Sequence, residues 1–312
     1  MIVTVTLNAA LDVTYAVAEL RPGASHRVSS VVETAGGKGV NVASVLAQGG
    51  LPVVATGIVG GCVGSRIRAD LDSRAVPHDF ADCAGESRRT LTVVSGRDSD
   101  ATVFNELGPQ VSAPEWRGFL AHLGGLVRHT SATVVVASGS LPCGLPPDAY
   151  AELLELAHEA GCRTVLDTSG EALGAALVAG PDVVKPNRDE LLEVTGVGDL
   201  SAGVAALRRM GARNVLASAG ADGMLLVGEE GLALAGRVDP PLIGNPTGAG
   251  DAAVAAIAAG LAAHTRWDDL LAESLAWSAA AVLKPVAGDV DRADVERLRS
   301  AVVIRPADSA RS

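Results

Sequence analysis

The stretch from Thr133 to Lys185 decides the fold class; it reads TVVVASGSLPCGLPPDAYAELLELAHEAGCRTVLDTSGEALGAALVAGPDVVK. Short apolar runs at 133–137, 164–167 and 182–185 predict buried strands, and the amphipathic segment 148–160 predicts a helix between the first two. Strands that alternate with helices indicate βαβ crossovers, which place helices on both faces of a mainly parallel sheet. We therefore expect an α/β fold.

The same alternation continues on both sides of this stretch. The further elements predicted by the periodicity are strands at 2–7, 53–59 and 214–218, helices at 65–74, 114–129 and 201–210, a helix after Gly39, a hairpin at 224–227 and 232–235, and a long alanine-rich helix after Gly248. The tail from Arg305 is expected to fray. Together these elements predict a doubly wound core.

Two β-rich patches interrupt this pattern near the N-terminus. The first comprises the runs 13–18 and 27–33, and the second comprises the runs 89–94 and 101–104. Both patches are rich in β-branched residues and contain no helical periodicity. We therefore expect them to form a small sheet that is separate from the core.

The composition disfavours several classes of protein. Hydrophobic residues make up 48% of the 312 residues and charged residues 20%, which suffices for a large core and argues against general disorder. The net charge of −11 disfavours nucleic acid or an anionic membrane as the main partner. The apolar stretch 252–263 is too short to span a bilayer, Met1–Thr6 lacks the basic segment of a signal peptide, and the four cysteines form no CxxC pair. We expect a cytoplasmic protein with reduced thiols.

Lysine is rare in this chain. The 25 basic residues include only three lysines, Lys38, Lys185 and Lys284. An ammonium group is a compact point charge, whereas a guanidinium group is a planar fork. A lysine retained among so many arginines is therefore a candidate for a role that arginine cannot fill.

The strongest chemical motif is NPTGAGD at 245–251, directly before the alanine-rich helix. Glycines at a helix start let backbone N–H groups approach an anion closely, and the helix dipole adds partial positive charge there. Asp251 is then either a helix cap or a base that faces a substrate hydroxyl beside a phosphate. A loose dinucleotide fingerprint at Gly248, Gly250 and Ala253 comes too late in the chain, and no GxxxxGK[ST] sequence is present.

A second glycine-rich motif, GGKGVN at 36–41, also precedes a predicted helix. Its glycines allow a tight wall against a small polar ligand, Lys38 offers a point charge, and Asn41 offers an amide that both donates and accepts. The alternative interpretation is a structural turn with an exposed lysine. Asp12, after the first strand, either accepts hydrogen bonds from a polyol or forms an ordinary Asx turn.

Small and polar residues follow several predicted strands. Ser138, Lys185 and Ser218 each stand at such a strand end, where ligands bind in open α/β sheets. Arg88 and Arg89 are adjacent in a predicted strand, so their side chains point to opposite faces and only one of them faces a site. The spacing of the histidines and cysteines gives no indication of a transition-metal site.

The segments GGKGVNVA at 36–43 and NPTGAGD at 245–251 resemble the two signatures of the PfkB, or ribokinase-like, carbohydrate kinases. The segments TLNAALD at 6–12, SGSLP at 138–142, DTSG at 167–170 and KPNRDE at 185–190 further resemble the branch of 1-phosphofructokinases and tagatose-6-phosphate kinases. The resemblance implies a ribokinase-like three-layer α/β fold with a small β-sheet lid. The core would comprise residues 1–10, 34–87 and 108–312, and the lid residues 11–33 and 88–107.

The resemblance implies an ATP-dependent kinase that uses Mg²⁺ and transfers the γ-phosphoryl group to a hydroxyl of a ketohexose phosphate. Fructose 1-phosphate is the leading acceptor. Tagatose 6-phosphate, fructose 6-phosphate and an unphosphorylated hexose remain alternatives, as does a non-catalytic sugar-phosphate sensor on the same fold. The intact GAGD sequence at 248–251 argues against the sensor. Lids of this kind often pair between subunits, which implies a homodimer.

The resemblance also assigns roles to individual residues. Asp251 matches the catalytic base, expected to stay ionised at neutral pH beside the helix dipole, and Gly248, Ala249 and Gly250 match the anion hole. The residues that match the sugar-phosphate side are Asp12, Gly37, Lys38, Asn41, Arg89 and Ser138, with Arg27 as a weaker phosphate contact. The residues that match the nucleotide side are Lys185, Asn187, Ser218, Gly220, Gly223 and Thr247, and Glu190 together with Asn187 matches an NxxE element linked to Mg²⁺. The chain departs from this branch at Ala9, where proline is usual, and at Leu91, where many relatives have asparagine.

Overall fold

A ten-stranded sheet forms the centre of the computed structural model, which describes residues 1–97, 100–242, 244–284 and 286–307. Its strands lie in the order β14 (Val302–Pro306), β13 (Ala233–Val238), β12 (Met224–Val227), β11 (Asn214–Ser218), β10 (Val183–Val184), β9 (Arg163–Asp167), β8 (Val134–Ser138), β1 (Ile2–Thr6), β4 (Val53–Val59) and β5 (Ala81–Asp82). Neighbours from β11 to β5 are parallel, and those from β11 to β14 are antiparallel. The parallel part brings the carboxyl ends of seven strands to one edge.

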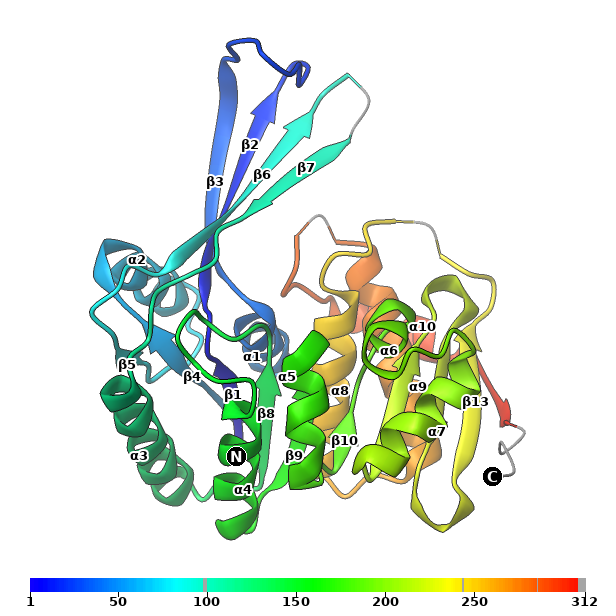
Figure 1. Cartoon of the computed structure of the whole chain (residues 1–312). Coiled ribbons are helices and arrows are strands. Elements are labelled where there is room, and N and C mark those ends of the chain that lie inside the picture. Colours follow the sequence, from blue (N-terminus) through cyan, green and yellow to red (C-terminus); the bar gives the residue numbers. More distant parts are fainter. Residues whose placement is uncertain (98–99, 243, 285, 308–312) are drawn as a thin grey trace.

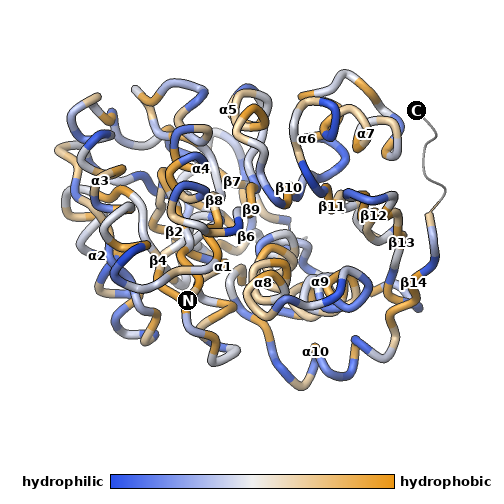
Figure 2. The backbone as a smooth tube through the Cα atoms, turned by 90° about the horizontal axis from the view of Figure 1, so that it is seen from below, coloured by the Kyte–Doolittle hydropathy of each residue, from blue (hydrophilic) through white to orange (hydrophobic). Residues whose placement is uncertain are grey.

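Helices cover both faces of this sheet (Figure 2). The helices of one face are α1 (Lys38–Gln48), α2 (Gly61–Ser73), α8 (Ala249–Ala262) and α9 (Trp267–Val282), and α10 (Arg292–Arg299) packs on α9. Those of the other face are α3 (Ala113–Thr130), α4 (Ala149–Glu159), α5 (Gly170–Ala176), α6 (Arg188–Thr195) and α7 (Leu200–Met210). Side chains of a strand alternate between the two apolar clusters: Val134 and Val136 face one, and Val135 faces the other. Burial on both faces explains the continuous apolar runs in the sequence.

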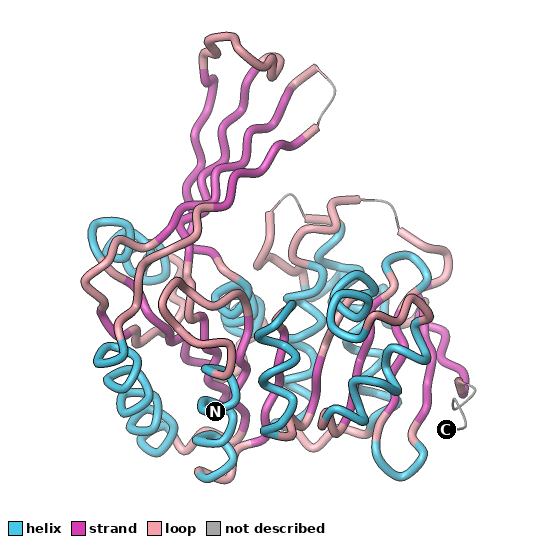
Figure 3. The backbone as a smooth tube through the Cα atoms, in the orientation of Figure 1, coloured by secondary structure: helices cyan, strands magenta, loops and turns pink. Residues whose placement is uncertain are grey.

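A separate four-stranded sheet projects away from the core (Figures 1 and 3). Its strands lie in the order β3 (Val28–Gly36), β2 (Ala10–Val17), β6 (Arg88–Ser95) and β7 (Ala101–Asn105). The base of the sheet is buried, as Ala35 shows, whereas residues 28–32 of β3 are exposed. Asp70 of α2 ties this base to the core, because its Oδ2 accepts a hydrogen bond of 2.9 Å from the backbone N–H of Ala35.

The predicted doubly wound α/β core with a small second sheet is confirmed. The prediction that the tail frays from Arg305 is wrong, because Arg305 and Pro306 belong to β14, which pairs with β13; residues 308–312 lie outside the described part. Asp12 lies inside β2 rather than in a turn before it. The α-helices and strands that were not predicted from the sequence are α5, α6, α9, α10, β5 and β14. Among the described residues, no helix is both long enough and apolar enough to cross a membrane.

Candidate active site

Two cavities meet at the carboxyl edge of the parallel strands. The larger, of about 760 Å³, is bounded by Asp167 at the end of β9, by Ser218 at the end of β11 and by the start of α8. The smaller, of about 460 Å³, lies beneath the base of the projecting sheet. Lys38 and Glu190 line both cavities, so these two side chains mark the junction.

The glycine-rich turn at the start of α8 forms one wall of the larger cavity. Gly248 is the N-cap of α8 and has a φ of 82°, a left-handed conformation that favours glycine. A Cβ atom at Gly250 would lie 3.4 Å from Nζ of Lys185, so this ammonium group faces the first turn of the helix. Backbone N–H groups in a first helical turn have no partner within the helix. That of Ala249 donates to the backbone oxygen of Pro246 at 3.2 Å, and those of Gly250 and Asp251, together with Lys185, could bind an anion.

Asp251 lies at this turn and is buried, with 7% of its surface exposed. Its Oδ2 accepts a hydrogen bond of 2.7 Å from Nδ2 of Asn41, a residue of α1. Burial and the negative charge of Asp167 raise the pKa of Asp251 to about 7, although Asn41 and the two lysines act in the opposite direction. Asp251 is therefore only partly ionised at neutral pH, which departs from the expectation that it stays ionised there, because burial and the charge of Asp167 outweigh Asn41 and the two lysines.

Asp167 joins the two predicted lysines into one cluster. Its Oδ1 lies 3.3 Å from Nζ of Lys38 and 3.4 Å from Nζ of Lys185. Burial by itself would raise the pKa of Asp167, but the two ammonium groups lower it below its usual value. Ser138 lines neither cavity. Its Oγ donates a hydrogen bond of 3.3 Å to Oδ2 of Asp167 and so helps to position this carboxylate.

Asn187 and Glu190 form a capping box at the start of α6. The backbone N–H of Glu190 donates to Oδ1 of Asn187, and the backbone N–H of Asn187 donates to Oε2 of Glu190, both at 2.8 Å. The other carboxylate oxygen of Glu190, Oε1, lies 3.3 Å from Nζ of Lys38. The pair therefore caps a helix and also presents one carboxylate oxygen at the junction of the cavities.

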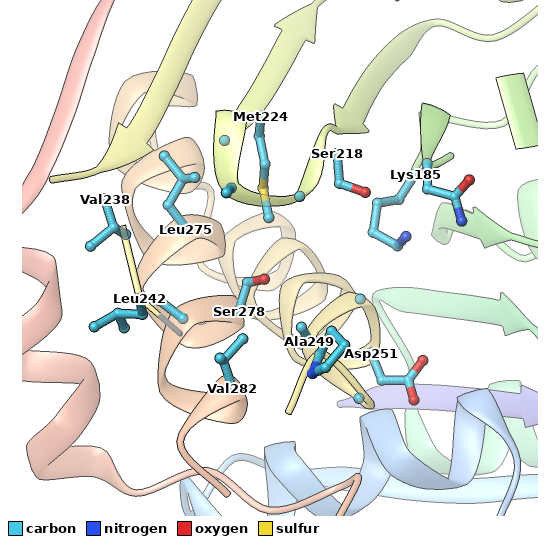
Figure 4. Close-up of a pocket in the computed structure, with 18 of the residues that line it drawn as sticks. Lys185, Ser218, Met224, Val238, Leu242, Ala249, Asp251, Leu275, Ser278 and Val282 are labelled. Atoms are coloured by element: carbon cyan, nitrogen blue, oxygen red, sulfur yellow. The ribbon is translucent and has the colours of Figure 1, made fainter. Parts of the chain in front are cut away.

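The far end of the larger cavity is mostly apolar, and Figure 4 shows this wall opposite Lys185 and Asp251. Its side chains come from Met224, Val238, Leu242, Leu275 and Val282, with Ser278 as a polar group among them. These residues could not be predicted from the sequence, because buried apolar side chains give no signal that separates a ligand wall from an ordinary core. Ser218, Gly220 and Gly223 line the cavity as predicted, whereas Thr247 is exposed and does not line it.

Of the six residues predicted for the sugar-phosphate side, two line the smaller cavity. Gly37 and Lys38 line it, and Ser140, Thr168 and Ser169 add hydroxyl groups from the loops after β8 and β9. These three hydroxyl residues were missed, although the motifs at 138–142 and 167–170 contain them.

Asp12 is half-buried in β2, beside this cavity. Burial raises the pKa of Asp12, while a hydrogen bond with Thr90 and the charge of Arg88 act in the opposite direction. Gly36 leaves room for the carboxylate, since a Cβ atom there would lie 2.0 Å from Oδ2 of Asp12.

The structure places Arg88, and not the predicted Arg89, at the smaller cavity. Arg88 lines the smaller cavity, and its Nε donates to the backbone oxygen of Asn8 at 3.0 Å. Arg89 is exposed on the opposite face of β6, and Arg27 is exposed as well. The alternation of side chains along a strand predicts that one arginine faces the site but does not say which one.

The position of Arg88 also bears on Leu91, which stands where many relatives have asparagine. Leu91 is partly buried against the core, so it does not face the smaller cavity with Arg88. The residue two positions after Arg88 is Thr90, which lies on the same face of β6. Its Oγ1 accepts a hydrogen bond of 3.3 Å from Nη1 of Arg88.

Comparisons with known proteins identify the family and the fold. The sequence profile described as pfkB family carbohydrate kinase matches residues 3–292. A 1-phosphofructokinase of Xanthomonas campestris pv. campestris is 42% identical over 270 residues, which cover 83% of each chain. The crystal structure of phosphofructokinase-2 from Escherichia coli has a TM-score of 0.89 at 27% identity and covers 96% of this chain and 98% of its own. Arabidopsis thaliana ribokinase shares the fold, with a TM-score of 0.73 at 20% identity and coverage of 96% and 98%.

Proposed function

This chain belongs to the pfkB family of carbohydrate kinases and is a phosphotransferase that acts on a hydroxyl group of a sugar phosphate; we propose that it transfers the γ-phosphoryl group of ATP to fructose 1-phosphate and releases fructose 1,6-bisphosphate. The observation that carries the proposal is the position of Asp251. Its buried carboxylate lies in the first turn of α8, close to the junction of an apolar-walled cavity and a polar one. This arrangement supports a nucleotide in the larger cavity and an acceptor in the smaller one.

The side chains at the junction suit phosphoryl transfer. The acceptor hydroxyl oxygen would form a bond to the γ-phosphorus, while the bond from that phosphorus to the bridging oxygen of ADP breaks. Asp251 would accept the hydroxyl proton. Phosphoryl transfer depends mainly on positioning and charge neutralisation. The N–H groups of the Gly248–Gly250 turn, together with Lys38 and Lys185, would stabilise the charge on the phosphoryl group in flight.

The residues at the junction also fit a magnesium ion. Oε1 of Glu190 lies at the junction of the two cavities, 3.3 Å from Nζ of Lys38. The described residues contain no group of three or more His, Cys, Asp or Glu that could hold a metal ion. Mg²⁺ commonly combines one or two carboxylates with phosphate oxygens and water, and bound there it would neutralise phosphate charge. Glu190 would hold it, because Asp167 is buried and already paired with both lysines.

Two observations favour an acceptor that already carries a phosphate. The smaller cavity combines the Arg88 guanidinium group with the Lys38 ammonium group and the hydroxyl groups of Ser140 and Ser169. Arginine and hydroxyl donors are typical of phosphate sites. The relative at 42% identity is a 1-phosphofructokinase, which favours fructose 1-phosphate. The similarity to phosphofructokinase-2 makes fructose 6-phosphate the second candidate.

A single assay tests the proposed function. ADP release is measured with ATP and Mg²⁺ across fructose 1-phosphate, fructose 6-phosphate, tagatose 6-phosphate and the unphosphorylated hexoses. We expect the highest kcat/KM with fructose 1-phosphate. Preference for another phosphosugar would overturn the proposed acceptor but keep the reaction class. Binding of phosphosugar without any ADP release would instead identify a sensor.

The activity of the free enzyme is expected to depend on pH through Asp251. Only the ionised carboxylate can accept a proton, and burial raises the pKa of Asp251 to about 7. We therefore expect kcat/KM to rise about tenfold per pH unit below pH 7 and to level off above it, measured by ADP release at subsaturating acceptor. A profile that stays flat from pH 5.5 to pH 8 would contradict the assignment of Asp251 as the base.

We also propose that two copies of the chain associate through the projecting sheet. Val32 of β3, Thr14 of β2, Thr92 of β6 and Val103 of β7 lie directly opposite one another and therefore share one face. Val32 and Val103 are each 50% exposed. Side chains alternate along β2, so Asp12 lies on this same face. A second copy seated there would bury this apolar row next to the smaller cavity.

The Val32→Glu variant is expected to convert the dimer into a monomer, because a charge would be buried in the interface. Sedimentation velocity measures this change. Val303→Glu is the matched control, since Val303 is 51% exposed on β14, in the other sheet. A monomeric wild type, or a dimer that persists in the Val32→Glu variant, would refute this interface.

A further inference from the structure

One face of α1 contacts the loop between α9 and α10. Asn41, Ser44 and Gln48 are three and four residues apart, so they lie on the same side of the helix. A Cβ atom at Gly288 would lie 3.3 Å from Oδ1 of Asn41 and 3.5 Å from Cβ of Ser44. The loop therefore packs closely on the helix that carries the hydrogen-bond donor to Asp251.

Gln48 connects the end of α1 to this loop through both ends of its amide group. Its Nε2 donates to the backbone oxygen of Gly288 at 2.9 Å, and its Oε1 accepts from the backbone N–H of Val290 at 3.1 Å. A side chain that lacks either the donor or the acceptor cannot make both bonds. Gln48 is exposed and lines neither cavity, so it does not contact a bound substrate.

The loop in turn supports the first glycine of the anion hole. A Cβ atom at Gly248 would lie 2.8 Å from Cα of Ala287 and 3.4 Å from the backbone nitrogen of Gly288. Ala287 therefore packs directly against the backbone of Gly248. Lys284, the third lysine of the chain, lies before the loop and pairs with Asp291 at 3.7 Å and with Asp294 at 3.6 Å beyond it. Both ends of the loop are thus held.

We propose that Gln48 is a positioning residue for the anion hole: through Gly288 and Ala287 it fixes the backbone of Gly248 in the orientation needed to stabilise the transferred phosphoryl group. The inference rests on the proposed kinase function. The N–H groups of this turn act on the charge that develops during transfer, so a small displacement affects the chemical step more than the binding of either substrate. Misplacement of a reacting group by about 1 Å can cost roughly 100-fold in rate.

The test uses two substitutions in the full chain. Gln48→Met keeps the length of the side chain but loses both hydrogen bonds, and Gln48→Glu keeps an acceptor for Val290 but loses the donor to Gly288. We expect kcat to fall about tenfold in both variants, with KM for ATP and for the acceptor within about twofold of the wild type and an unchanged Tm. Glu296→Gln is the control. Glu296 is exposed on α10, and among the described residues its only ion-pair partner is Arg292.

A second measurement separates positioning from a general loss of structure. The combination of ADP, aluminium fluoride and acceptor mimics the transition state of phosphoryl transfer. The Gln48 variants should bind it about tenfold more weakly than the wild type, while their affinity for ATP alone stays the same. An unchanged kcat in folded variants, or a rise in KM alone, would overturn the inference. If Gln48→Met does not fold, Gln48→Glu decides the matter. A wild type without phosphoryl transfer would refute the proposed function instead.

Discussion

The Asp251→Asn variant is expected to turn over roughly 10²–10⁴-fold more slowly than the wild type, the usual cost of removing a general base. An amide has nearly the volume of the carboxylate but cannot accept the hydroxyl proton. Its oxygen can still accept the hydrogen bond that Asn41 donates at 2.7 Å, so the fold around the first turn of α8 should be preserved. The loss is measured as kcat by ADP release, and acceptor binding is measured by calorimetry.

Acceptor affinity should change little in this variant, because the substitution removes a group that acts during the transfer. Asp72→Asn is the matched control, since Asp72 is exposed on α2 and pairs with His78. If Asp251→Asn kept more than a tenth of the wild-type kcat, Asp251 would not be the base. A large loss of acceptor affinity with a normal kcat would make Asp251 a binding residue.

The Arg88→Ala variant is expected to raise KM for the phosphosugar by roughly 10- to 100-fold. Hydrogen bonds to charged groups contribute about 1.5–3 kcal/mol, and each 1.4 kcal/mol is a factor of ten. Arg88 lines the smaller cavity and is held by Asn8 and Thr90, so its guanidinium group is already ordered before a phosphate arrives. The effect is measured as KM for the acceptor at saturating ATP.

The neighbouring arginine provides the control for this experiment. Arg89 has the same chemistry but is exposed on the other face of β6, so Arg89→Ala should leave KM within about twofold of the wild type. KM for ATP should be unchanged in both variants. A larger effect from Arg89→Ala than from Arg88→Ala would show that the acceptor phosphate binds elsewhere.

Much of the site follows from the sequence because its residues are local in the chain. The turn from Gly248 to Asp251 belongs to one short motif at a helix start, and Lys185 and Ser218 directly follow apolar strands. The parallel sheet then brings these local motifs to one edge. The periodicity of the chain therefore predicts both the fold and the side of the sheet that carries the site.

Other features depend on contacts between distant segments and could not be predicted. Arg88 and Arg89 are equivalent in the sequence, and only the orientation of β6 decides between them. The raised pKa of Asp251 comes from burial and from Asp167, whereas the motif by itself indicates only a helix N-terminus. β14 contains the β-branched run 302–304, which is typical of a strand, but its pairing with β13 depends on a segment about 70 residues away. The role of Gln48 depends on a loop 240 residues away.

The projecting sheet is tied to the core at its base and extends away from it (Figure 1). Arg88 of β6 and Asp12 of β2 lie near its buried base, while Val32 of β3 and Val103 of β7 lie farther out along the neighbouring strands. A rotation of the sheet about its base would therefore displace the outer residues, Val32 and Val103, farther than it displaces Arg88 and Asp12. In the proposed dimer, a subunit contact on the outer rows would therefore act on the position of Arg88 and Asp12, and assembly would be coupled to binding of the acceptor.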